Sequence, residues 1–104
     1  MITINGEVWR VRMVSPYHPI LNYGGYHPAL GCCDDITKTI YINNTQDTDS
    51  IKKVLCHEMV HAVMYSYNVD MSDYVEEIVA DIFATYGNEI IALTHLVYDK
   101  YKFF

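Results

Sequence analysis

Three ionisable side chains, His57, Glu58 and His61, stand in the segment 54–64, which is otherwise apolar. Ionisable groups buried in an apolar helix are costly unless a partner satisfies them. Residues four apart lie one turn above each other on the same helix face, so His57 and His61 can present two imidazole nitrogens to one ion. Glu58 lies one step round the helix and can take a proton from a water on that ion. The spacing predicts a Zn²⁺ site with Glu58 as general base.

A second apolar segment, predicted to be helical over 72–86, carries further acidic side chains. A catalytic zinc ion usually has three protein ligands and one open position. Glu77 and Asp81 are four residues apart and share one face of this helix. We expect Glu77 to be the third ligand and Asp81 to accept a hydrogen bond from the outer nitrogen of His57. Glu76 is expected to lie on a solvated face, favoured there by the helix dipole.

The first part of the chain has the pattern of β-strands. Asn5-Gly6 readily takes positive φ angles and predicts a type I′ turn between strands over 2–4 and 8–14. An aromatic loop follows, and then a second hairpin that turns at Asp34-Asp35. The loop is expected over 15–28 and the strands of the second hairpin over 29–33 and 36–43.

The second part has the pattern of two or three helices. The first should begin near Thr48 to Ser50, where short polar side chains can cap it, and run to about Tyr67. Asp73 and Glu76 have the spacing of a capping box at the start of the second. Gly87-Asn88 predicts a stop or bend, and a third, amphipathic helix is expected over 89–102. Strands followed by helices indicate an α+β domain, a single one over 1–104.

Composition excludes some classes of partner. The chain has 13 acidic and 7 basic side chains, a net charge of −6, and no cluster of Lys and Arg. Nucleic acids and anionic lipids require concentrated positive charge, so neither is expected as a partner. No apolar stretch is long enough to span a membrane, and the first residues lack the pattern of a signal peptide.

The cysteines are Cys32, Cys33 and Cys56, an odd number with two adjacent. This is a poor basis for a disulfide framework and indicates a reducing cytoplasm, with the thiols as small apolar groups. A redox or metal-ligand role for the adjacent pair is the alternative.

The two segments together resemble the gluzincins, zinc peptidases with a glutamate third ligand and an aspartate one turn later. Metzincins instead have a histidine six residues after the second ligand and a glycine between them, where this chain has Tyr67 and Met64. Over residues 29–86 the chain looks most like the small bacterial and phage metallopeptidases of the ImmA/IrrE family. The matching elements are the strand Ile40-Tyr41-Ile42 and the segment Ala80-Asp81-Ile82-Phe83-Ala84.

That resemblance implies a minimal zincin-like domain that hydrolyses a protein or peptide substrate, such as a regulator. The strand over 36–43 is expected to border the cleft and to pair with extended substrate. Tyr74, His27 and His18 are candidates to stabilise the oxyanion. Two alternatives stay open: a zinc-binding module without catalysis, and a partner-binding protein without metal that uses the loop 15–28 as its interface.

Overall fold

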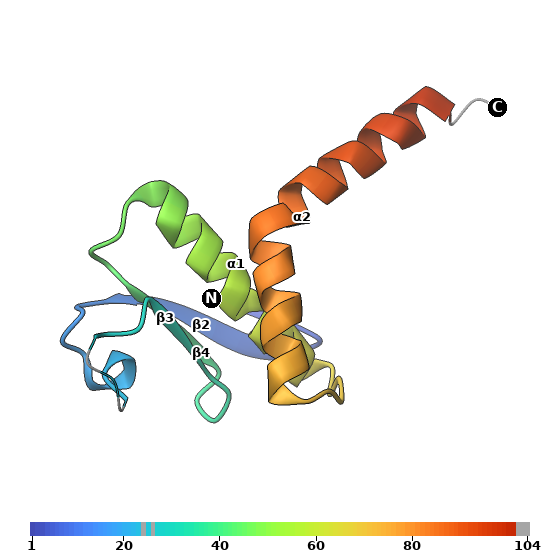
Figure 1. Cartoon of the computed structure of the whole chain (residues 1–104). Helices are drawn as coiled ribbons and strands as arrows, with labels where there is room; N and C mark the ends of the chain where they lie inside the picture. Colours follow the sequence, from blue (N-terminus) through green and yellow to red (C-terminus); the bar gives the residue numbers. More distant parts are fainter. Residues whose placement is uncertain (24, 26, 102–104) are drawn as a thin grey trace.

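The computed structural model describes residues 1–23, 25 and 27–101. The chain forms a four-stranded sheet followed by two helices, which confirms the α+β class (Figure 1). In chain order the elements are β1 (Ile2–Ile4), β2 (Glu7–Val14), a short 3-10 turn η1 (Pro19–Leu21), β3 (Gly31–Asp34), β4 (Thr39–Asn43), α1 (Thr48–Ser66) and α2 (Asp73–Tyr101).

The first hairpin forms as predicted. β1 and β2 pair antiparallel, with Ile2 opposite Trp9 and Ile4 opposite Glu7. The turn residues Asn5 and Gly6 have φ angles of 48° and 78°. Both lie in the left-handed region that Asn and Gly tolerate best, as a type I′ turn requires.

The sheet is mixed: both predicted hairpins are antiparallel, and a parallel pairing that was not predicted joins them. The strand order is β1-β2-β4-β3, and β2 pairs with β4 in parallel, with Val11 opposite Ile40. The chain reverses once between β2 and β3 and again in the turn before β4. Two reversals make β4 run in the direction of β2. Sequence patterns identify hairpins because those are local, whereas this pairing joins segments far apart in the chain.

The strand predicted over 36–43 begins only at Thr39. Ile36 is 88% exposed and belongs to the turn, and Lys38 has a φ angle of 51°, which is incompatible with an extended strand. β4 is also a central strand, paired with β2 on one side and β3 on the other. The strand with a free edge at this end of the sheet is β3.

Polar side chains begin both helices. Asp47 caps α1 by accepting a hydrogen bond from the Ser50 backbone N–H at 2.8 Å. Ser72 caps α2 in the same way, accepting from the Val75 N–H at 3.3 Å. The predicted capping box of Asp73 and Glu76 is not what begins α2, because the Glu76 carboxylate is bonded elsewhere, as described below.

The third helix is not a separate element. α2 continues without interruption from Asp73 to Tyr101, through Gly87 and Asn88. One glycine costs a helix only about 1 kcal/mol relative to alanine, which neighbouring turns can offset. A Cβ at Gly87 would lie 3.2 Å from the Phe83 ring, so the absent side chain leaves room for that ring. Figure 1 shows α2 changing direction in its orange portion, so the bend was predicted and the stop was not found.

The core lies between the sheet and α1. Its fully buried members are Trp9, Ile40, Ile42 and Ala62, and Val54, Leu55 and Met59 of α1 pack against them. The Trp9 Nε1–H donates a buried hydrogen bond to Ser66 Oγ at 2.7 Å. On another side, α2 crosses α1 and packs against it (Figure 1). The helix 48–66 is therefore held on both sides, which fixes its rotation about its own axis.

In the distal half of α2 the large apolar side chains are half-exposed or more; they include Ile90, Ile91, Leu93, Leu96, Val97 and Tyr98. In the described part of the chain, neither helix has the length and hydropathy needed to cross a membrane.

Gly31 permits the close approach of β3 to α1. A Cβ at this position would lie 2.6 Å from Val54 Cγ1 and 3.1 Å from Glu58 Cγ. Real Cβ atoms do not come so near, so any larger residue would push the edge strand away from the helix that carries Glu58.

Gly31→Ala should therefore destabilise the fold by about 1–3 kcal/mol, the usual cost of overpacking. Val54→Ala removes the nearer obstacle, so the double variant should lose less stability than the sum of the two single variants. Urea denaturation of the four proteins measures this coupling. Strict additivity would show that β3 and α1 do not meet at Gly31.

Candidate metal centre

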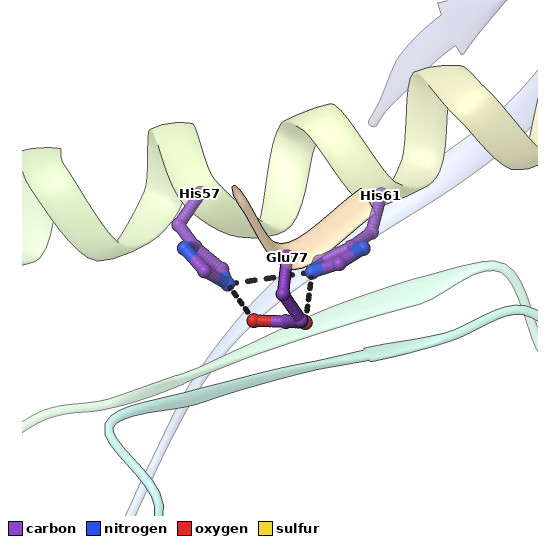
Figure 2. Close-up of side chains that lie close together, drawn as sticks. All are labelled: His57, His61 and Glu77. Carbon is purple, nitrogen blue, oxygen red and sulfur yellow. Dashed lines mark hydrogen bonds and ion pairs between the residues drawn. The ribbon is translucent and has the colours of Figure 1, made fainter. Parts of the chain in front are cut away.

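His57 and His61 of α1 and Glu77 of α2 direct their polar atoms at one point (Figure 2). The two histidine Nε2 atoms are 3.3 Å apart. Glu77 Oε2 lies 3.1 Å from His57 Nε2, and Glu77 Oε1 lies 2.7 Å from His61 Nε2. One ligand atom from each residue falls within 4.8 Å of the others. The structure thus brings together the three residues that the sequence analysis selected as ligands.

The outer nitrogen of each ring contacts a second carboxylate. His57 Nδ1 lies 2.9 Å from Asp81 Oδ1, which is the predicted contact. His61 Nδ1 lies 2.7 Å from Glu76 Oε1. The Glu76 side chain is only 21% exposed, so its assignment to a solvated face was wrong. Each histidine therefore has its own orienting carboxylate, and both come from α2.

A pattern in the sequence could have revealed Glu76. Where α1 and α2 meet they run in opposite directions, so His57 meets Asp81 and His61 meets residues about one turn earlier in α2. Once Asp81 is paired with His57, antiparallel packing places positions 76 and 77 opposite His61. Adjacent glutamates there can serve as an orienting group and a ligand.

The contacts of the two Nδ1 atoms with carboxylates leave the lone pairs of the inner ring nitrogens facing each other. A ring that donates its Nδ1–H to a carboxylate has no hydrogen on Nε2 when the ring is neutral. The inner nitrogens of His57 and His61 and both oxygens of Glu77 then point unshared electron pairs into one small space. Such a cluster is repulsive unless a cation lies within it, either a proton on a ring or a metal ion. Two imidazoles and a carboxylate are a donor set that suits zinc.

Glu58 is the most buried acidic residue near this cluster, with an exposed fraction of 7%. Its Oε2 atom is buried and has no hydrogen-bond partner among the described residues. Burial raises the pKa of its carboxyl above the ordinary value against the opposing effect of His61 and His57, and the charge of Glu77 adds to the rise. A buried carboxylate without a partner is costly, and a water molecule that donates to it would remove that cost.

The pKa of His61 is also raised. Burial acts to lower it, but the hydrogen bond to Glu76 and the charges of the surrounding carboxylates outweigh burial. The ring therefore holds a proton more readily than a free imidazole does. A proton and a metal ion compete for the same nitrogen, so metal affinity at this site should fall as pH falls.

Two cavities lie on opposite sides of Glu58, and Gly31 and Glu58 line both of them. The larger, with a volume of about 690 Å³, extends towards the C-terminal end of α1 and the start of α2. The smaller, about 410 Å³, extends towards the N-terminal half of α1 and is bordered by Leu30, Val54 and Ala84. β3 runs past both cavities, so together they form a cleft along the edge strand with Glu58 at its middle.

The three candidates for oxyanion stabilisation do not line either cavity. Tyr74 is 77% exposed on α2. His18 accepts a hydrogen bond from the Ile20 N–H and packs against the Tyr41 ring, and His27 is exposed. Side chains of the larger cavity with a hydroxyl or amide donor are instead Tyr65 and Asn68. The sequence alone does not point to these two residues, because neither belongs to a motif.

All three cysteines are free. Burial is the main reason that the pKa of the Cys33 thiol is raised to about 12, and it also raises the pKa of Cys32. Protonated thiols are poor nucleophiles and poor metal ligands. Among the residues that the structure describes, the cysteines join no group of potential ligands, and the one such group is His57, His61 and Glu77.

Comparison of the chain with models of protein families, with curated proteins and with solved structures returned no match.

The burial of Glu58 predicts that Glu58→Gln stabilises the metal-free protein at neutral pH. Because the folded-state pKa lies above the unfolded one, the ionised carboxylate destabilises the folded state above the folded pKa. The effect disappears as pH falls below the ordinary pKa of glutamate. A gain of about 1 kcal/mol would raise Tm by roughly 4–8 °C for a domain of this size.

Thermal unfolding in the presence of a chelator, followed across pH, measures this difference. Glu89→Gln on the exposed part of α2 is the matched control and should leave Tm unchanged. A Glu58→Gln variant that is less stable than wild type at neutral pH would contradict the assignment of Glu58 as an uncompensated buried charge.

Proposed function

We propose that this protein is a zinc-dependent peptidase. The observation that carries the proposal is the convergence of two Nε2 atoms and a carboxylate on one point, beside the unpartnered buried oxygen of Glu58. The first arrangement suits a divalent cation, and the second suits a water molecule that is about to lose a proton. Together they are the requirements of metal-assisted hydrolysis.

Each residue then has a defined task. His57, His61 and Glu77 would hold the ion, and Asp81 and Glu76 keep the rings in the tautomer whose Nε2 lone pair faces it. Zinc, when bound, lowers the pKa of a water molecule and polarises a carbonyl group. Glu58 accepts the proton of the attacking water and passes it to the leaving amine.

Substrate binding is best assigned to β3. The Asn43 N–H donates to the Leu30 carbonyl at 3.0 Å. In an antiparallel ladder successive residues alternate in direction, so Leu30, Cys32 and Asp34 bond to β4. The backbone groups of Gly31 and Cys33 then point outward, where an extended peptide can pair with them. Assignment of this role to the strand over 36–43 was wrong, because β4 has a neighbour on each side.

The motif residues remain similar to those of the gluzincins, and of the ImmA/IrrE peptidases among them. On that resemblance we extend the proposal to a zincin-like fold and cleavage of a protein such as a regulator. These two extensions depend on the family, whereas the zinc chemistry depends on the contacts in this chain. A cytoplasmic location is proposed on the three free cysteines.

The first test is metal content and turnover. Purified protein should contain about one zinc ion per chain by elemental analysis and hydrolyse peptides of a broad set. Glu58→Gln should keep the zinc and lose at least about 100-fold in activity, since it removes the general base. Glu77→Ala should lose both zinc affinity and activity.

Three outcomes would contradict parts of the proposal. Protein with much less than one zinc per chain after growth in zinc-supplemented medium would exclude a zinc site. Stoichiometric zinc in a protein that is inert against every peptide would favour the structural role, in which the metal joins α1 to α2. Undiminished zinc affinity in Glu77→Ala would remove Glu77 as the third ligand.

A second test concerns Glu76. If it orients His61, then Glu76→Gln should weaken zinc binding by about 10–100-fold, as the loss of an orienting hydrogen bond usually does. Asp81→Asn should have an effect of similar size through His57. Competition with a fluorescent chelator measures both affinities, and Glu89→Gln on the same helix is the control. Wild-type affinity in Glu76→Gln would show that its contact with His61 does not support the metal.

A further inference from the structure

The larger cavity beside Glu58 is strongly acidic. Asp35 from the β3–β4 turn, Asp70 from the connection between the helices and Asp73 at the start of α2 all border it. The lining also includes Glu76 and Glu77 of α2 and Glu58 of α1. None of the residues that line the cavity is a lysine or an arginine. Lys38, in the same turn as Asp35, is paired with Glu7 at 3.3 Å.

The cavity also has apolar lining. Met64, Tyr65 and Val69 contribute to it beside the carboxylates. A cavity that combines apolar and acidic side chains is complementary to a side chain that has an aliphatic stem and a positive end. Lysine and arginine have this construction, and they bury their stems while the charged group stays near water and carboxylates.

A second, independent observation indicates that something binds here. Glu58 lines the same cavity, is 7% exposed, and has an Oε2 atom without a partner in the described chain. Glu58 lines both cavities, as does Gly31 on the free edge of β3. A peptide paired with β3 would therefore place its backbone at Glu58 and one of its side chains in the acidic cavity.

We infer that the acidic cavity is a specificity subsite that binds a lysine or arginine side chain on one side of the scissile bond. This inference rests on the proposed peptidase function. The smaller cavity, on the other side of Glu58, should show the preference less strongly. Apart from Glu58 its lining has one carboxylate, that of Asp81, and one lysine, Lys53. The two ends of the cleft thus differ in charge.

The preference should be moderate and sensitive to salt. The carboxylates of Asp35, Asp70 and Asp73 belong to exposed residues, and ion pairs at such positions are individually weak. Acting together they should favour a basic peptide over a neutral one by about tenfold at low ionic strength. The ratio of the two affinities should fall towards one in high salt, because screening weakens interactions between exposed charges.

Binding and cleavage test the inference separately. Short fluorescent Ala-Gly peptides with one central Lys, Arg, norleucine or Glu are titrated into Glu58→Gln protein in the presence of zinc, with anisotropy as the readout. The Lys and Arg peptides should bind about tenfold more tightly than the norleucine peptide. Adding Asp35→Asn and Asp70→Asn should remove that difference, whereas Asp49→Asn, an exposed acid outside the cavity, should not.

Cleavage by the wild-type protein is then followed in peptides whose single lysine is moved along the chain. The cut should move with the lysine and keep a constant distance from it. Asp70→Lys should weaken the preference for lysine more than Asp70→Asn does. Circular dichroism verifies folding of each variant, and the neutral Asn variants are sufficient for the test if Asp70→Lys does not fold.

The outcomes separate this inference from the proposed function. A lysine preference in binding without any cleavage would leave the subsite standing and overturn the peptidase proposal. Cleavage without preference for a basic residue would overturn the subsite and leave the peptidase proposal standing. Equal affinity for the Lys and norleucine peptides at low salt would overturn the subsite whatever the cleavage result.

Discussion

Where α1 and α2 cross, lone pairs of two histidines and a glutamate face one another. These lone pairs repel unless a cation lies between them. His57 and His61 each use Nδ1 to contact a carboxylate of α2, which turns both Nε2 atoms inward to within 3.3 Å of each other. Glu77 adds its two oxygens at 2.7 and 3.1 Å. Rotating either helix about its axis would break several of these contacts at once, because all of them depend on one antiparallel crossing. The packing that stabilises the helix pair is thus the same packing that forms the candidate metal centre.

The sheet has a different part in the same arrangement. Ile40, Ile42 and Trp9 form a buried surface on which one face of α1 rests, and that contact sets which side of α1 is left for α2. Gly31 lets β3 approach within contact of Glu58, so the free strand edge, the buried carboxylate and the histidine pair lie in one cleft. Placing Glu58 beneath the edge strand buries its Oε2 without a partner. Sites that bind and activate water commonly accept such a cost in stability.

Local sequence patterns predicted much of the fold and of the candidate site. The Asn5-Gly6 turn was found because its positive φ angles suit those two residues and few others. The starts of α1 and α2 follow from polar caps, and the contact of His57 with Asp81 follows from helical spacing. The errors arose where a distant segment decides the outcome. The carboxylate of Glu76 binds His61 instead of capping α2, which Ser72 caps, and α2 continues through Gly87, next to the Phe83 ring. The parallel pairing of β2 with β4 depends on the path of the chain between them, which no local pattern records.

The sequence by itself determined which residues are chemically equipped to hold an ion, because the spacing of His57, His61, Glu77 and Asp81 along helices places them on common faces. It also determined that the domain belongs to the α+β class. Only the tertiary structure decided that Glu76 orients His61, that β3 rather than β4 has the free edge, and that acids from separate segments line one cavity. The physical reason is that the spacing of residues along the chain determines which side chains share a face only within one helix or one strand. Contacts between elements depend instead on how their buried faces pack, and that is a property of the whole chain.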